Sequence, residues 1–517
     1  AAWVSGGSGP RWIPVAQPDL WESSSRRDWR GQPAACMPPS AAVVGKAEAR
    51  ESTRLKADDH SESAPAPSSS ERAPLEGSGC ALGMLTVGYM FNFVDRQILV
   101  IVQDLIKRDM ALSDSQLGLL SGFSFALVYV TLSIPIAYLA DRGNRRNILA
   151  LAVFTWSGMT ALSGCARTFP QLALARAGVG IGEAGGSPPA HSMISDYYPP
   201  ERRASALGIY SAGLHAGILA GFLLGGVASE RLGWRAAFMV VGSPGVVFAC
   251  LLSATVAEPP RGRWEPSGVA GYAPTLRETV ALLLRYPSFW YGAAGAALAS
   301  FAGYGNGNFA PSFLMRNHGL GVKEAGVALA FAGGGAGFVG TLASGCVADR
   351  LGARDKRWYF LVPSLAACVA LPLNVPCLLL SDTQAAVLLM FVCTALNNSY
   401  LGPCLAMSHA LVPPAMRAIT SAVLFFVINF IGLGFGPLVA GALSDALTPA
   451  YGADGLRYAM LVVAAISSLG AFMFFKAARA LPSDLEAASE VGRMTVGVPE
   501  EQSTVPCQPC SAAVTTE

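Results

Sequence analysis

Long apolar stretches separated by short polar ones fill the chain from residue 81 to residue 478. Each stretch has roughly 20 to 28 residues, and a helix that rises about 1.5 Å per residue needs about 20 residues to cross a hydrocarbon core about 30 Å thick. The pattern therefore predicts twelve transmembrane helices. We expect them near residues 81–106, 116–140, 147–166, 170–195, 204–228, 235–256, 289–315, 324–348, 358–380, 384–411, 418–443 and 456–478.

Polar segments divide the chain into five regions. Residues 1–79 and 481–517 are polar, with too few periodic apolar positions to offset the entropy of ordering, so we expect disordered tails there. Residues 257–287 are also more polar and contain proline, which predicts a cytosolic central loop. The predicted fold is all-α, a polytopic membrane protein whose two six-helix bundles span residues 80–256 and 288–480.

Composition and charge support this interpretation. Of all residues, 52% are hydrophobic and 14% are charged, whereas a soluble domain carries about 25% charged residues. Sixteen Lys and Arg residues flank the helices on the side of the central loop, and eight flank them on the other side. The positive-inside rule therefore places both termini of this integral multi-pass membrane protein in the cytosol, while the membrane concerned stays open. The basic residues form short clusters rather than one stripe, so nucleic acid is not expected as a partner.

The two halves of the chain repeat each other. Residues 138–146 (YLADRGNRR), after the second apolar stretch, match residues 346–357 (CVADRLGARDKR), after the eighth. Residues 197–204 (YYPPERRA), after the fourth stretch, match residues 411–418 (LVPPAMRA), after the tenth. Two matches in the same order, at corresponding helices, indicate duplication of a six-helix unit. Such duplication is typical of transporters whose two halves rock about a central site.

These segments resemble the major facilitator superfamily, whose signature between helices 2 and 3 is G-x-x-x-D-R-x-G-R-R. Residues 137–146 read AYLADRGNRR, with Ala for the first Gly and the second Gly shifted to position 143. The second copy, residues 345–354, fits the signature better, and residues 176–182 meet the R-x-x-x-G-x-G pattern of helix 4. The resemblance covers about residues 80–480 and implies the superfamily's fold and transport by alternating access.

Two further segments are similar to the spinster-like branch of that superfamily. They are residues 91–97 (FNFVDRQ) in helix 1 and residues 178–204 (GVGIGEAGGSPPAHSMISDYYPPERRA) in helix 4. Members of this branch are proposed carriers of lysolipids and sphingolipid-type amphiphiles. The resemblance therefore implies a small-molecule or lipid substrate, with membrane lipid as a partner.

Helix 1 carries ionisable residues at membrane depth, where they are rare and costly. Tyr89, Asn92 and Arg96 fall on one helical face at about 100° per residue, and Asp95 lies beside that face. A polar face must meet protein or water, because lipid offers no hydrogen bonds. We expect it to line a cavity, with Arg96 anchoring an anionic head group and Asp95 accepting a proton. A neutralised ion pair that fixes helix packing is the alternative.

Helix 4 carries Glu183 seven residues after Arg176, so both point the same way about 10 Å apart. Burial favours a neutral carboxyl group and a nearby arginine favours a charged one, so Glu183 is a second candidate for proton coupling. A permanent pair between Glu183 and Arg96 or Arg176 is the alternative. If helices 1 and 4 line the cavity as in the family, Asp95, Arg96 and Glu183 form one cluster.

The duplicated loops after helices 2 and 8 predict two cytosolic gates. In the family, the Asp at such a helix end holds the neighbouring bundle when the transporter faces outward, and ion pairs that break and reform suit this switch. Positive charge that only sets topology is the alternative. The gate residues are Asp141, Arg142, Arg145, Asp349, Arg350 and Arg354.

The function predicted from these features is a secondary active transporter of a small organic or amphipathic solute, coupled to protons and functional as a monomer. A sugar or organic-acid symporter or uniporter stays open, as does a non-transporting receptor or intramembrane enzyme. Duplicated gates favour transport, and neither GxSxG nor HExxH occurs, so no enzyme activity is expected. The lone CxxC of the tail, without a second pair, predicts no metal site. No Walker A loop occurs, and no cofactor is expected.

Overall fold

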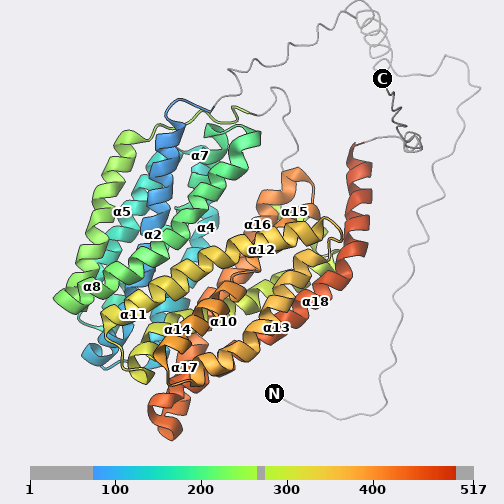
Figure 1. The fold of residues 1–517 in the computed structure, drawn as a ribbon. Coiled ribbons are helices and arrows are strands. Elements are labelled where there is room, and N and C mark those ends of the chain that lie inside the picture. The colour runs from blue at the N-terminus through green and yellow to red at the C-terminus, as the bar shows by residue number, and fades with distance from the viewer. Residues whose placement is uncertain (1–73, 265–273, 497–517) are drawn as a thin grey trace, which may run out of the picture. The chain divides into compact units, whose positions relative to one another are not determined.

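The structure is a computed structural model that describes residues 74–264 and 274–496. The expected disordered tail at residues 1–73, the middle of the central loop and residues 497–517 lie outside this part. Within it, every one of the twelve predicted apolar stretches coincides with a helix or a run of helices (Figure 1). Seven of these helical segments are long and apolar enough to cross a membrane by length and composition alone.

The N-terminal bundle contains spans 1 to 6. Its helices are α2 (Ser78–Met110), α3 (Asp114–Gly118), η1 (Leu119–Phe123), α4 (Ser124–Arg142), α5 (Arg145–Ser163), α6 (Phe169–Ala184), α7 (Ser187–Tyr197) and α8 (Pro200–Thr255). With 56 residues, α8 supplies spans 5 and 6, because its helical conformation breaks at Gly233, where φ is 81°. Only glycine adopts such a φ without a steric penalty, so this residue turns the chain back between the two spans.

The C-terminal bundle contains spans 7 to 12, preceded by a short helix in the central loop. Its helices are α9 (Leu276–Leu283), α10 (Pro287–Asn317), α11 (Val322–Leu329), η2 (Ala330–Gly335), α12 (Ala336–Gly352), α13 (Trp358–Leu379), α14 (Thr383–Asn397), α15 (Leu401–Ala410), η3 (Pro414–Met416), α16 (Arg417–Ile428), η4 (Asn429–Phe435), α17 (Gly436–Tyr451), η5 (Gly452–Asp454) and α18 (Gly455–Val496).

Two boundaries differ from the sequence-based prediction. Helix α18 continues to Val496, so residues 481–496 belong to a helix and not to the expected tail. Leu481 is fully buried there, and Asp484 accepts a hydrogen bond of 2.7 Å from the backbone N–H of Ser288, near the start of α10. The predicted loop likewise contains α9, which begins with a capping box formed by Thr275 and Glu278.

Span 4 is interrupted at a pair of prolines, whereas span 7 is a continuous helix. Helix α6 ends at Ala184, and α7 begins at Ser187 just before a proline pair. In span 7 the glycine-rich run at residues 303–308 does not interrupt the helix, and α10 is helical throughout. Its flanking apolar residues are buried and hold the helix together.

Glycines bring spans 1 and 5 into close contact. Gly213, Gly217, Gly221 and Gly225 of α8 face α2. A Cβ atom built at Gly213 or Gly217 would lie 2.6 Å or 2.5 Å from a backbone carbonyl oxygen of α2. Small residues spaced four positions apart on a membrane helix allow such a close approach of two backbones.

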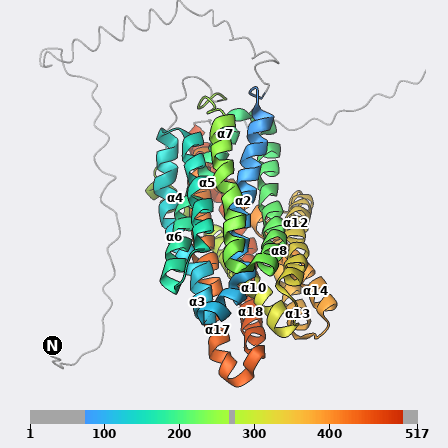
Figure 2. The same cartoon turned by 90° about the vertical axis from the view of Figure 1, so that its left-hand side faces the viewer.

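The two bundles meet at the end of the helices opposite the central loop, which we call the joined end. There α3 lies against α17 (Figure 2). A Cβ atom at Gly118 or Gly441 would collide with the backbone of the other bundle. We call the opposite end, where α2 starts and the central loop lies, the basic end.

Candidate functional site

A cavity of about 320 Å³ lies between the two bundles. Helices α2, α6 and α8 supply residues on one side of it, and α10, α13 and α14 supply most of the other side. The three π-helical turns in the described part of the chain also reach it, through Ser121 of η1, Ala332 and Gly333 of η2 and Leu433 of η4. A π-turn inserts one residue into a helix and frequently marks a functional site. The sequence pattern gave no sign of these turns.

Arg96 lines the cavity but has a partner. Its Nε donates a hydrogen bond of 2.6 Å to Oε2 of Glu183, and a terminal nitrogen forms an ion pair with the same oxygen. The guanidinium carbon also lies 4.7 Å from the centre of the Phe125 ring and 5.4 Å from that of Tyr129. Of the predicted cluster, Arg96 and Glu183 are therefore in contact, and the aromatic residues of α4 complete it.

Arg176 also lines the cavity, and two of its nitrogens lack a hydrogen-bond partner among the described residues. Its residue surface is 2% exposed, and neither Nε nor Nη1 forms a hydrogen bond within the described part of the chain. The guanidinium carbon lies 5.6 Å from the centre of the Phe125 ring. A buried charge without a partner is costly, so this arginine is the stronger candidate for binding an anion.

Asp95 is completely buried and is not among the cavity-lining residues. Its Oδ2 accepts a hydrogen bond of 2.8 Å from the hydroxyl of Ser157 on α5, and its Oδ1 has no partner in the described part. Glu183 is likewise buried away from the cavity wall, and its Oε1 is unpartnered. The two carboxyl groups therefore lie behind the arginines, inside the N-terminal bundle.

The other predicted residues of helix 1 also lie outside the cavity wall. Asn92 is buried in α2, and the Tyr89 ring stacks on that of Tyr210 with centroids 4.5 Å apart. Arg96 is thus the one member of the predicted polar face that reaches the cavity. Helical periodicity placed these residues on one side of α2 but did not show that α8 covers part of that side.

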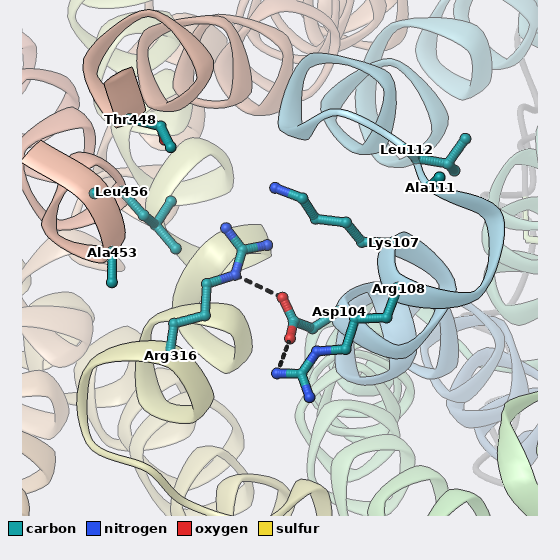
Figure 3. A pocket seen from close by; sticks show the side chains of 10 residues that line it. Asp104, Lys107, Arg108, Ala111, Leu112, Arg316, Thr448, Ala453 and Leu456 are labelled. Carbon is teal, nitrogen blue, oxygen red and sulfur yellow. Dashed lines mark hydrogen bonds and ion pairs between the residues drawn. The ribbon is translucent and has the colours of Figure 1, made fainter. Parts of the chain in front are cut away.

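An ion-pair network lies at the joined end, and Figure 3 shows part of it, the contacts of Asp104 with Arg316 and Arg108 beside a pocket. Arg316 of α10 donates 2.6 Å to Asp104 of α2 and binds both carboxylate oxygens of Asp114, at 2.8 and 2.9 Å. Lys107 also binds Asp114, and Asp445 of α17 accepts hydrogen bonds from the backbone N–H groups of Asp114 and Ser115. The network thus holds the bundles together at this end.

Comparison with known proteins identifies the family of this chain. The family model of the Major Facilitator Superfamily matches residues 85–437. A solved bacterial homolog of the human lysosomal transporter Spinster, inward-facing and unoccupied, has a TM-score of 0.73 with 33% identity, covering 81% of this chain and 99% of that chain.

The chain belongs to the major facilitator superfamily.

Two relatives indicate which branch of the superfamily the chain belongs to. An MFS-type efflux pump of Mycolicibacterium smegmatis is 37% identical over 413 residues, which is 78% of this chain and 94% of that protein. The sphingosine-1-phosphate transporter SPNS2 of Danio rerio is 30% identical over 242 residues, 46% of this chain and 47% of that protein. The chain is thus a transporter of the spinster-like branch and not an enzyme, which confirms the resemblance seen in the sequence.

The superfamily signature residues contact their own bundles in this structure. Arg145 is buried and donates to Asp196 and Ser192 of α7 and to Glu258, just after the end of α8. Burial opposes its charge, but the two carboxylates outweigh that effect and hold the pKa of its guanidinium above the usual value. Arg142 stacks on Tyr138, with its guanidinium carbon 4.1 Å from the ring centre.

In the second copy, Asp349 accepts a hydrogen bond of 2.8 Å from the hydroxyl of Tyr359. No hydrogen bond or ion pair between bundles is found for Arg350 or Arg354 in the described part. The side chain of Asp141 lies outside the described residues. The gate roles of all six residues stay predictions, and Arg145 additionally fixes α5 to α7 and to Glu258, just after the end of α8.

The joined-end network was missed at the sequence level. Lys107 and Arg316 counted there only as charges that set topology. The available signal was the concentration of acidic residues at the same helix ends, Asp104, Asp109 and Asp114, because opposite charges facing each other across a short loop can pair.

Proposed function

We propose that this transporter carries an amphipathic anion by alternating access, coupled to protons, as a monomer. The observation that carries the proposal is Arg176, a buried guanidinium with two unpartnered nitrogens at the wall of a largely apolar cavity. An anionic group of a substrate would supply the missing partner. Similarity to SPNS2, a sphingosine-1-phosphate transporter, supports an anionic lipid as the substrate.

Charge balance supports coupling to protons. The cluster contains two arginines, Arg96 and Arg176, and two carboxyl groups, Asp95 and Glu183. With both carboxyl groups ionised its formal charge is zero, and protonation of one leaves a charge of +1. An arginine keeps its proton, so the carboxyl groups must do the proton work. A substrate anion restores neutrality in the protonated state, and we therefore propose that proton and anion bind together.

Asp95 is the better candidate for the proton. Glu183 forms an ion pair with Arg96, which favours its charged form, whereas Asp95 is held by one neutral hydroxyl group. One of its oxygens also lacks a partner. Protonation of Asp95 removes a buried charge without breaking an ion pair.

The contacts between bundles suit the inward-facing half of a transport cycle. If the basic end lies in the cytosol, as the distribution of Lys and Arg predicts, the joined end is the closed outer side. The proposed gates of Asp141 and Asp349 would then engage the opposite bundle only when this outer side opens. The cavity and the network that closes it lie within one chain, which supports a functional monomer.

Transport of an alkyl phosphate into liposomes containing the purified protein tests the proposal. We expect Arg176→Gln to weaken binding of the anion about 10- to 150-fold, since a charge-assisted hydrogen bond contributes about 1.5–3 kcal/mol. Arg277→Gln, at an exposed position on α9 outside the cavity, is the matched control and should behave as the unchanged protein. Equal transport by Arg176→Gln, or selective transport of a sugar or a small organic acid, would contradict the proposal.

A further inference from the structure

The two walls of the cavity differ in their chemistry. Both arginines come from the N-terminal bundle, and the C-terminal bundle supplies no Lys, Arg, Asp or Glu to the lining of the cavity. It supplies carboxamides instead, which gather on α10, α13 and α14. They are Asn306, Asn308, Asn374, Asn397 and Asn398.

These carboxamides have hydrogen-bonding groups that the described part of the protein does not use and that can bind a ligand. Asn308, Asn374 and Asn398 each donate from Nδ2 to the carbonyl oxygen four residues earlier, at 2.8 Å. Each therefore keeps an acceptor oxygen and a second N–H. The Oδ1 of Asn306 is buried without any partner in the described part. A buried polar atom without a partner is costly, so this wall is suited to a group that hydrogen-bonds to it.

A carboxamide is neutral and combines donors with an acceptor. It can bind a hydroxyl or an amide, which also donate and accept, but it cannot balance a second ionic charge. The chemistry of the wall therefore fits a neutral hydrogen-bonding group, while Arg176 on the opposite bundle fits an anion. A ligand with both groups would contact both bundles, as a carrier that rocks about its substrate requires.

The cavity becomes apolar towards the joined end. Met390 lies seven residues, about 10 Å, nearer that end than Asn397 on α14, and Leu378 lies about 6 Å beyond Asn374 on α13. Both belong to the hydrophobic core that fills this half of the molecule, together with Phe222 of α8. An aliphatic chain is the ligand portion that suits this region.

We propose that the carboxamides of α10, α13 and α14 form a second subsite, which binds hydroxyl or amide groups in the head of the substrate. The substrate is then an amphiphile with an anion on the Arg176 side, neutral hydrogen-bonding groups on the carboxamide side, and an aliphatic chain directed to the joined end. The assignment of an anion to the Arg176 side rests on the proposed function, whereas the carboxamide subsite is supported independently by its unused hydrogen-bonding groups.

Binding of matched ligands to the protein in lipid nanodiscs tests this subsite. The ligands are a 1-acyl-glycerol-3-phosphate and its 2-deoxy analogue, which lacks the free hydroxyl. The unchanged protein should prefer the hydroxylated compound by about 2- to 10-fold, the effect of one hydrogen bond. Asn306→Leu should abolish this preference while retaining binding of the deoxy compound, because the Oδ1 of Asn306 has no hydrogen-bond partner among the described residues that the substitution would remove.

Asn429→Leu is the matched control. Asn429 also donates to the carbonyl oxygen four residues earlier, but it does not line the cavity. It should keep the full preference. Equal affinities of the unchanged protein for both ligands, or an undiminished preference in both Asn306→Leu and Asn374→Leu, would overturn the subsite.

A neutral alkyl glycoside separates this inference from the proposed function. Binding that requires Asn306 but not Arg176, with no binding of either phosphate, would support the carboxamide subsite and refute the anion anchor. Phosphate binding that requires Arg176 and does not depend on the hydroxyl group would support the anion anchor and refute the carboxamide subsite.

Discussion

Two arginines lie near the ring of Phe125, and only Arg96 has a counter-charge within hydrogen-bonding distance. The sequence predicted a cluster of Asp95, Arg96 and Glu183, and named two possible partners for Glu183. It assigned the anion to Arg96 because periodicity cannot decide which side chain reaches the carboxylate. In the structure the pairing uses Arg96 and leaves two nitrogens of Arg176 without a partner in the described part, so the proposed anchor moves from span 1 to span 4.

Because Arg96 forms the ion pair with Glu183, we expect its replacement to lower the stability of the fold. We expect Arg96→Gln to lower the free energy of unfolding by about 3–5 kcal/mol, because removing one member of a buried ion pair leaves the Glu183 carboxylate uncompensated. The Arg96→Gln/Glu183→Gln double variant should recover much of that loss. Thermal unfolding in detergent measures both effects. A destabilisation of Arg96→Gln that is not relieved in the double variant would show that the ion pair is not the cause.

Helices were predictable from the sequence because lipid requires long apolar stretches with internally satisfied backbones. The interruptions within these helices were harder to predict from the sequence. The proline pair indicated the α6–α7 break, but the three π-turns depend on how each helix packs against its neighbours. The extension of α18 to Val496 was missed because its few buried apolar residues, such as Leu481, are spaced among polar ones.

At the scale of elements, the contact between α2 and α8 makes a direct prediction. Gly217→Ala should lower the free energy of unfolding by about 1–3 kcal/mol, the usual cost of overpacking, because its Cβ would lie 2.5 Å from the carbonyl oxygen of Met90. Gly208→Ala, on the same helix with no atom within 4 Å, is the control and should be neutral or slightly stabilising. Equal thermal stability of the two variants would contradict this packing.

At the scale of the whole molecule, internal duplication predicted two bundles around a central cavity, and the structure has a cavity lined by residues from both halves of the chain. The sequence could not predict which end of the bundles is joined, because that depends on the conformational state and on pairs of residues more than 200 positions apart. Asp114 and Arg316 are such a pair. They are the residues whose contacts must break if the joined end opens.

This network predicts a shift in the conformational equilibrium. Asp114→Asn removes the carboxylate bound by Lys107 and Arg316, and should favour opening of the joined end. The buried cavity thiols Cys377 and Cys393 would then react faster with a membrane-impermeant thiol reagent added from that side, in a background whose exposed cysteines are replaced by serine. Arg108→Gln removes an exposed contact within α2 alone and should change little. Unchanged labelling in Asp114→Asn would show that this network does not hold the joined end closed.

Proton coupling at the buried cluster is the central claim, and uptake of an anionic amphiphile into liposomes under an imposed pH gradient tests it most directly. With the unchanged protein, an acidic exterior should accelerate uptake of the external anion, because proton and anion are proposed to bind together. Asp95→Asn, which mimics the protonated carboxyl group, should still transport the anion but at a rate independent of the gradient. If Asp95→Asn and Glu183→Gln both respond to the gradient as fully as the unchanged protein, the cluster is structural and the proposed coupling is wrong.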